Sequence, residues 1–260
     1  MKAARLILCA VCLSLIGWSA LPAQDFSLEQ TLQHLQTLSS DEYQGRGNGT
    51  EGGKMARVYL VKEFEQTGLE KFGENYVHSF QFFHRIKKEK REGHNIIGWI
   101  RGKKNLDKFL VVSAHYDHMG IQEDSIYNGA DDNASGAAAL LAIANHFKLN
   151  QPDHSIIIVA FDAEELGLQG ARHFVDEPPV PLEDILLNIN LDMIGRNANN
   201  EIYIAGTYHY PNLKKPISRV IMLLFIKKIF PSSILVWKII PTITAREMIL
   251  RRLCLSFMAM

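Results

Sequence analysis

Three segments of the chain carry apolar residues at the spacing of a helix. They are Ser27–Leu38, Lys54–Thr67 and Ala134–Phe147. Because side chains three or four positions apart lie on one side of a helix, each segment is predicted to be helical with one buried face. Gly68 directly follows the second segment and predicts its end, since glycine readily adopts the left-handed conformation found at helix C-termini.

Short, continuous apolar runs predict three buried β-strands, namely Phe109–Ala114, Ser155–Phe161 and Leu186–Leu191. Such runs without polar alternation are typical of strands covered on both faces. Because these strands alternate with helices, the pattern favours an α/β fold with a mostly parallel sheet. Open sheets of this kind bind their ligands at the carboxyl edge of the strands.

Two further segments, Tyr76–Arg85 and His94–Arg101, also predict strands. The charged stretch between them, Lys87–Gly93, is interpreted as the solvated tip of a hairpin rather than as a binding patch. Ser39–Gly53 is polar and rich in glycine, which indicates a loop with close backbone turns.

The first 23 residues have the pattern of an export signal. Lys2 and Arg5 precede an apolar stretch, Leu6–Ile16, and small residues at 19–23 predict cleavage near Ala23. The apolar stretch is shorter than the roughly 20 residues that a membrane-spanning helix needs. We therefore predict an exported protein, periplasmic or extracellular, without a stable membrane span.

The formal net charge of zero hides an uneven distribution. Residues 213–260 contain nine Lys or Arg and one Glu, so the preceding 212 residues carry a net charge of −8. An acidic body gives no reason to expect nucleic acid as a partner. At 260 residues and 47% hydrophobic composition, the chain is long enough for one sizeable α/β domain.

The residues that follow the predicted strands carry the candidate chemistry. His115 ends the first apolar run, and Asp117 lies two positions further on, on the same face of an extended chain. A histidine that binds metal commonly donates its second N–H to a carboxylate, which fixes its tautomer, and Asp117 fits that role. Alone, a histidine at a strand end is more often simply hydrogen-bonded. His118 is interpreted as structural.

Asp131 and Asp132 precede the third predicted helix. Taken alone, they are explained by helix capping, because aspartate accepts hydrogen bonds from the free N–H groups at a helix start. The alternative is that one of the two carboxylates bridges two cations, while the neighbouring glycines let the backbone come close.

Glu164 and Glu165 follow the second apolar run, and Asp192 follows the third. Adjacent acids at a helix N-terminus are favoured by the helix dipole, which alone would explain the pair. Successive carboxylates can instead point in different directions, one to a metal and one to a reacting proton. Asp192 ends an apolar strand, where a carboxylate needs a partner such as a cation. Four such signals at successive strand or loop ends predict a metal site.

Four motifs carry a resemblance to a known family. In chain order they are AHYDH (114–118), GADDNASG (129–136), DAEELGLQGARHF (162–174) and NLDMIGR (190–196). Their order and spacing, with the similar segment Leu38–Leu69, resemble the M28 family of di-zinc aminopeptidases, of the exported bacterial type, over about Leu35–Gly206. The resemblance implies a phosphorylase/hydrolase-like zinc peptidase core, in which a mixed, mostly parallel sheet lies between helices. It also implies two zinc ions at the carboxyl edge of the sheet and peptide substrates.

The resemblance also implies a role for each side chain. Four are metal ligands: His115 and Asp192 at the first zinc, Glu165 at the second, and Asp132 as the bridge between them. Glu164 is the general base, which takes a proton from the attacking water and later gives it to the leaving amine. Asp117 orients the ligand histidine.

The chain departs from the family pattern after Asp192. The family has a second histidine ligand well downstream of this position. The one histidine that follows Asp192 is His209, which lies too early to match and is interpreted as a surface residue. We therefore expect the second site to bind zinc weakly and the 260-residue chain to be inactive or nearly so.

Residues 213–260 also differ in composition from the rest, since all 18 glycines lie before residue 213. We interpret this segment as a divergent basic, apolar tail foreign to the fold, and residues 24–212 as an incomplete M28-type domain. A frameshift between Thr207 and Val220 would explain the change. The alternative is a genuine tail that docks on a membrane surface, although it lacks a clean helical stripe.

The predicted function is a zinc-dependent exopeptidase, most simply an aminopeptidase. Glutaminyl cyclase-like and carboxypeptidase-like activities are alternatives on the same fold. An alternative of another class is a non-catalytic metal-binding or peptide-binding remnant. Zinc stoichiometry separates these classes, because close to two ions per chain supports an enzyme and one or none supports a remnant.

Overall fold

A computed structural model describes residues 27–195 and, as backbone, the strands β9 (Ile204–Ala205) and β10 (Val236–Ile240). The predicted signal peptide, residues 1–23, lies outside the described residues. So does most of the predicted tail, 213–260, of which only β10 is described. The predicted boundary at residue 212 therefore stays a prediction.

The three predicted helices are confirmed, with small shifts at their ends. They are α1 (Leu28–Leu38), α2 (Glu51–Thr67) and α3 (Gly136–Leu149). The first begins where the side chain of Ser27 accepts a hydrogen bond from the N–H of Gln30. A short helix that the sequence analysis did not predict, α4 (Gln169–Asp176), follows the motif around Glu164. The other helical elements of the described residues are two short 3₁₀ turns, Asp41–Arg46 and Leu182–Asp184, and one wider π-type turn, Ala130–Ser135.

The strands form one large sheet and one small hairpin. In chain order they are β1 (Glu70–Lys71), β2 (Val77–His84), β3 (Glu89–Ile100), β4 (Asn105–His115), β5 (Gly120–Gln122), β6 (Ser125–Tyr127), β7 (His154–Phe161), β8 (Ile185–Asp192), β9 and β10. The described strands of the large sheet run in the order β1-β3-β7-β4-β8-β10-β9, and β2 pairs with β3. The hairpin consists of β5 and β6, neither of which was predicted.

The α/β fold class with a mixed sheet between helices is confirmed, and parallel pairing is concentrated at its centre. There β4 is parallel to both β7 and β8. The flanking pairs β3–β7 and β8–β10 are antiparallel, as are β1–β3 and β2–β3, whereas β9–β10 is parallel. The expectation of a mostly parallel sheet thus holds for the three central strands, at whose carboxyl ends the site lies.

The predicted hairpin is confirmed, but its tip is shorter than expected. Val77 pairs with Ile96 and His84 with Glu89, so most of Lys87–Gly93 is strand rather than loop. Charged side chains are compatible with a strand here because most of them project into solvent, and the backbone still bonds to β2.

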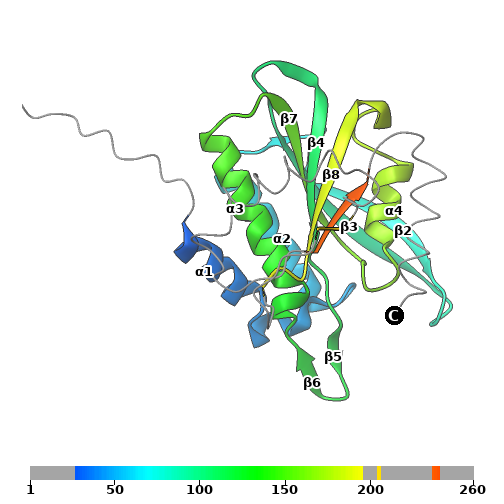
Figure 1. The fold of residues 1–260 in the computed structure, drawn as a ribbon. Helices are drawn as coiled ribbons and strands as arrows, with labels where there is room; N and C mark the ends of the chain where they lie inside the picture. The colour runs from blue at the N-terminus through cyan, green and yellow to red at the C-terminus, as the bar shows by residue number, and fades with distance from the viewer. Residues whose placement is uncertain (1–26, 196–203, 206–235, 241–260) are drawn as a thin grey trace, which may run out of the picture.

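Helices cover both faces of the sheet (Figure 1). On one side α1, α2 and α3 lie together, and α4 lies on the other side. Successive residues of β7 alternate between the two cores, with Ile156 and Ile158 in the larger one and Ile157 and Val159 in the smaller one. Because β7 is buried on both faces, its sequence is continuously apolar, as the strand prediction assumed.

The glycine-rich loop at Ser39–Gly53 makes the close backbone approach that its composition predicts. Gly45 has a φ of +67°, and a Cβ atom there would lie 2.3 Å from the carbonyl oxygen of Tyr127 and 2.7 Å from that of Gly120. Only glycine fits against the β5–β6 hairpin at this point. Among the described residues, no helix combines the length and hydropathy needed to cross a membrane.

Candidate metal centre

The carboxyl ends of the central strands bring three predicted ligands together. His115 is the last residue of β4, and Asp192 is the last residue of the adjacent strand β8. Asp132 lies in the turn before α3. The Nε2 atom of His115 lies 3.3 Å from Oδ1 of Asp132 and 3.5 Å from Oδ1 of Asp192.

This arrangement fits a zinc ion. Zinc binds histidine nitrogen and carboxylate oxygen at about 2.0–2.1 Å with tetrahedral geometry, so two ligand atoms on one ion lie about 3.3–3.4 Å apart. The two separations measured from His115 are 3.3 and 3.5 Å. The three side chains are therefore already spaced as ligands of one ion.

The charge of the site also calls for a cation. Burial lowers the pKa of His115, but the nearby carboxylates outweigh that effect and raise its pKa well above the ordinary value. A proton on the imidazole thus offsets the surrounding negative charge. A metal ion would do the same at larger charge, with the imidazole neutral and coordinating. The carboxylates that raise the pKa of His115 are those of Asp117, Asp132 and Asp192, with a smaller contribution from Glu164.

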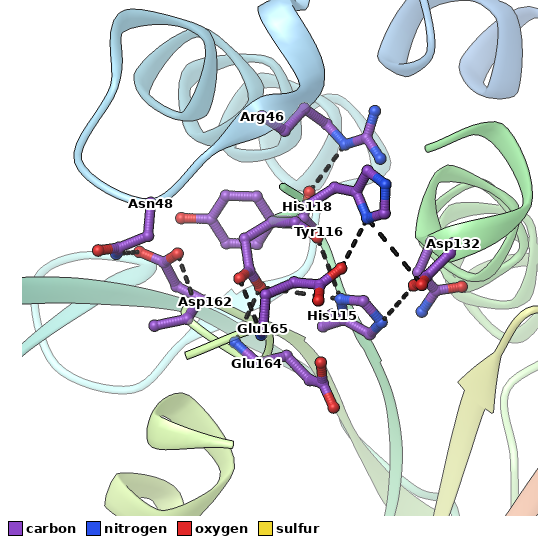
Figure 2. Close-up of polar contacts among 12 residues, drawn as sticks. Arg46, Asn48, His115, Tyr116, His118, Asp132, Asp162, Glu164 and Glu165 are labelled. Atoms are coloured by element: carbon purple, nitrogen blue, oxygen red, sulfur yellow. Dashed lines mark hydrogen bonds and ion pairs between the residues drawn. The ribbon is translucent and has the colours of Figure 1, made fainter. Parts of the chain in front are cut away.

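A second group of candidate ligands lies on the other side of Asp132 (Figure 2). Nδ1 of His118 lies 2.7 Å from Oε1 of Glu165 and 4.0 Å from Oδ2 of Asp132. The two oxygens of Asp132 therefore face two different histidines. In this group of three, each residue offers one ligand atom, and the atoms lie within 4.8 Å of one another. His118, which the sequence analysis interpreted as structural, belongs to the site.

Asp117 orients His115 in a different way from the one predicted. Nδ1 of His115 is 3.1 Å from the main-chain oxygen of Asp117, whereas the carboxylate oxygen Oδ1 is 3.8 Å away. The carboxylate accepts hydrogen bonds from the main-chain N–H groups of Glu164 and Glu165, at 3.0 and 3.3 Å. Fully buried, Asp117 thereby connects the histidine strand to the loop that carries the two glutamates.

Glu164 and Glu165 lie in the loop after β7, not at the start of a helix. The next helix, α4, begins only at Gln169 and has no acidic residue in its first turn. The helix-dipole explanation for the pair is therefore wrong. Burial raises the pKa of Glu164 to about 7, with nearby carboxylates adding to the effect and His115 opposing it. A carboxylate with a pKa in this range can accept a proton and release it again near neutral pH.

Neither Asp131 nor Asp132 caps α3, as the helix-capping interpretation of this pair would require. The N–H of Gly136, the first residue of α3, donates to the side chain of Asn133 at 3.0 Å. Asp131 accepts a hydrogen bond from the N–H of Gly195 at 2.8 Å. Asp132 alone of the pair points to the histidines.

Asn133 holds this turn to the end of β8. Its side chain is completely buried, and Nδ2 donates to the carbonyl of Leu191 at 2.9 Å. Its Oδ1 also accepts from the N–H of Met193 at 3.2 Å. Because Leu191 and Met193 flank Asp192, Asn133 fixes the distance between Asp132 and Asp192.

Arg46 is the largest polar side chain buried in the described part of the chain, and the sequence analysis did not single it out. Its guanidinium donates to four main-chain carbonyls, those of Tyr116 at 2.9 Å, Leu38 at 2.5 Å, Asn128 at 2.7 Å and Gly129 at 2.8 Å. Burial lowers its pKa to about 10, so the group stays charged at neutral pH. These four hydrogen bonds, which we call the Arg46 clasp, therefore join the segment after His115 to the segment that leads to Asp132.

Asp162 anchors the glutamate loop at its start. Its carboxylate accepts hydrogen bonds from the side chain of Asn48 and from the N–H groups of His94 and Ala163. Burial raises its pKa. Asp162 belongs to a recognised motif, but its role could not be predicted, because Asn48 lies 114 positions away in the sequence.

An open groove of about 880 Å³ adjoins the metal centre. It runs between the β2–β3 hairpin and the β5–β6 hairpin and reaches the ligand side chains. Its walls include His84, Arg91 and Ile121, and its floor next to the metal centre includes Asp117, His118 and Glu165. An extended ligand in this groove would present one end to the carboxylates.

The fold and site together define an α/β protein with a group of histidine and carboxylate side chains that could hold metal, at the carboxyl edge of its sheet. The sequence profile of peptidase family M28 matches residues 95–228, slightly more than half of the chain. The chain belongs to this family. Membership implies zinc as the metal, and the match runs past the predicted domain end at residue 212.

Known proteins agree with this assignment. The chain is 38% identical to aminopeptidase YwaD from Bacillus subtilis over 115 residues, which are 42% of this chain and 24% of that protein. The match spans less than half the length of the first curated relatives. A leucine aminopeptidase precursor from Bacteroides thetaiotaomicron has the same fold, with a TM-score of 0.64, 21% identity, and coverage of 88% of this chain and 82% of that one. A glutaminyl cyclase from the same organism matches with a TM-score of 0.63 at the same identity and coverage.

Proposed function

We propose that the chain is a zinc-dependent exopeptidase, most simply an aminopeptidase. The observation that carries the proposal is the position of Glu164, whose pKa is raised to about 7, in the loop next to ligands that converge from two strand ends. A peptidase needs a group that moves a proton beside a cation that polarises a carbonyl. The relation to YwaD, named as an aminopeptidase, supports the finer assignment.

The residues of the chain would hold two zinc ions. His115 and Asp192 would bind the first and Glu165 the second, and Asp132 would bridge them, since its two oxygens face opposite ways. Bound zinc would supply Lewis acidity. It would polarise the scissile carbonyl and would lower the pKa of the attacking water, so that the water loses a proton more readily.

In this mechanism Glu164 acts as a general base and then as a general acid. It accepts a proton from the attacking water as the water oxygen bonds to the scissile carbonyl carbon. It then delivers this proton to the nitrogen of the leaving amine as the C–N bond breaks, which leaves a carboxylic acid and an amine. Asp117 keeps Glu164 in place through the main-chain N–H of that residue. The groove beside the site would bind the peptide chain.

Glutaminyl cyclase activity is a second candidate, because solved glutaminyl cyclases share the fold. The two activities differ in their product. Incubation of the zinc-loaded chain with unblocked peptides, followed by mass spectrometry, gives a ladder of shortened peptides for an aminopeptidase. Peptides that begin with glutamine lose ammonia without shortening if the chain is a cyclase. Loss of residues from the other end indicates a carboxypeptidase, and binding without turnover supports a non-catalytic remnant.

Glu164→Gln tests the proposed mechanism. The variant should lose activity by roughly 10²–10⁴-fold while its zinc content is unchanged, because the amide keeps the size of the side chain but accepts no proton. Glu177→Gln is the matched control, since Glu177 is exposed at the end of α4. Full activity in Glu164→Gln would rule out this residue as the base.

We also propose that the protein is exported, on the basis of the N-terminal pattern in residues 1–23. The N-terminal residue of the protein isolated from fractionated cells tests this directly. A start near residue 24 in the periplasmic or extracellular fraction supports export, and an intact N-terminus in the cytosol contradicts it.

A further inference from the structure

His118 and His115 occupy comparable positions around Asp132. Nε2 of His115 faces one oxygen of Asp132, at 3.3 Å, and Nδ1 of His118 faces the other, at 4.0 Å. Each histidine also faces a second carboxylate, Asp192 for His115 and Glu165 for His118. Each half of the site thus consists of one imidazole nitrogen and two carboxylate oxygens.

We infer that His118 supplies the nitrogen ligand of the second zinc, together with Asp132 and Glu165. The inference rests on the proposed two-zinc function and assigns the nitrogen ligand of the second ion to a residue of the described chain. It replaces the expectations that the second site binds weakly and that the chain is inactive, which considered only histidines after Asp192.

The distances around His118 are compatible with a shared ion. Ligand atoms on one tetrahedral zinc lie about 3.3–3.4 Å apart. The separations from Nδ1 of His118 are 2.7 Å to Glu165 and 4.0 Å to Asp132, one shorter and one longer than this value. A shared ion would require the Glu165 carboxylate to move roughly half an ångström away from the imidazole and the Asp132 carboxylate to move a similar distance toward it.

The imidazole of His118 is held in place from several directions. Its side chain is only 9% exposed, and its main-chain N–H donates to the carbonyl of Arg46 at 3.3 Å. Gly129 has a φ of +55°, and a Cβ atom there would lie 2.5 Å from Cδ2 of the ring. A side chain at position 129 would thus collide with the ring, and glycine leaves the space that it fills. A ligand confined in this way loses little conformational entropy on binding metal.

The experiment measures zinc and cobalt binding by the full chain. The metal-free protein is titrated with Zn²⁺ in competition with a chromophoric chelator. The wild type should bind two equivalents, and His118→Gln should bind the second at least about a hundredfold more weakly while keeping the first. Glutamine retains a hydrogen bond to Glu165 but is a poor zinc ligand, so the variant separates coordination from support of the fold.

Proton NMR of the Co²⁺-loaded chain gives a direct reading of the ligands. A coordinated imidazole has one ring N–H left, and the paramagnetic ion shifts its signal far from the others. Two such signals are expected in the wild type and one in His118→Gln. His209→Gln is the control and should keep both. If His118→Gln unfolds, which circular dichroism detects, the wild-type NMR assignment with selectively labelled histidine decides the question.

The outcomes separate this inference from the proposed function. Two unchanged zinc equivalents, or two shifted signals, in His118→Gln would overturn the role of His118 and leave the two-zinc function standing. If the wild type binds one zinc equivalent and His118→Gln still binds it, the role of His118 is overturned and only the first site remains. No zinc binding by the wild type would overturn both.

Discussion

The two halves of the metal centre are built from different kinds of structure. His115 and Asp192 end the paired strands β4 and β8, and the side chain of His115 is 3% exposed. His118 and Glu165 lie in loops beyond the strand ends, and the side chain of Glu165 is 25% exposed. Asp132 belongs to both halves. We call His115, Asp132 and Asp192 the strand-end half, and His118, Asp132 and Glu165 the loop half.

The difference shows in how closely each half approaches the geometry of a bound ion. The strand-end half has ligand separations of 3.3 and 3.5 Å, whereas the loop half has 2.7 and 4.0 Å. Strands hold side chains more rigidly than loops do. We therefore expect the strand-end half to bind zinc more tightly, and the loop half to be the one that adjusts.

The largest effect is expected from His115→Ala, which removes the only nitrogen of the strand-end half. The first zinc should bind roughly 10³-fold more weakly, about 4 kcal/mol. Chelator competition measures the loss. His154→Ala is the control, because His154 lies at the opposite end of β7. If the tighter zinc survives in His115→Ala, the strand-end half is not the tighter site.

Arg46→Met should weaken both halves together. The substitution leaves four carbonyls without their donor, and we expect the free energy of unfolding to fall by about 3 kcal/mol. Urea unfolding of the metal-free chain measures this. Arg91→Met, which removes a single ion pair with Glu89, should change it by less than about 1 kcal/mol. An equally small change in Arg46→Met would show that the clasp is dispensable.

Asn133→Ala should act mainly on the strand-end half. It removes three hydrogen bonds of a completely buried side chain, and we expect a loss of about 2 kcal/mol in unfolding free energy. The first zinc should weaken more than the second. Asn150→Ala, at the exposed end of α3, is the control and should be nearly neutral. An equal weakening of both zinc ions would contradict the division into two halves.

Asp117→Asn should give the smallest effect, because the main-chain oxygen that faces His115 remains. The amide still accepts one of the two N–H groups of the glutamate loop but cannot accept both. Zinc affinity should fall roughly tenfold. Asp176→Asn, on the exposed end of α4, is the matched control. A loss as large as that of His115→Ala would mean that the carboxylate itself orients the imidazole.

The central strands and the main helices could be predicted because their signals are local. The apolar run Ser155–Phe161 and the stop at Gly68 each reflect a preference that the neighbouring residues already express. The structure of residues 89–93 was harder to predict, because a strand whose exposed positions carry charged side chains resembles a loop in sequence. The pairing that decides their structure is with β2 and is not visible locally.

Within the site, the sequence indicated which candidate ligands lie together better than which side chains hold them in place. His115, Asp132 and Asp192 follow strands or turns whose ends could be located. His118 lies beyond the end of β4, where the course of the backbone depends on contacts with Arg46 and Gly129. Such long-range contacts leave no periodic pattern in the sequence.

The Arg46 clasp affects how far this protein can be truncated before the site fails to form. The family profile matches only residues 95–228, and a fragment cut to those limits would contain every candidate ligand. It would lack Arg46, Asn48 and the strand β2, and with them the donors to Tyr116 and Asp162. We therefore expect the smallest unit able to assemble the site to be larger than the region by which the family is recognised, and to include residue 46.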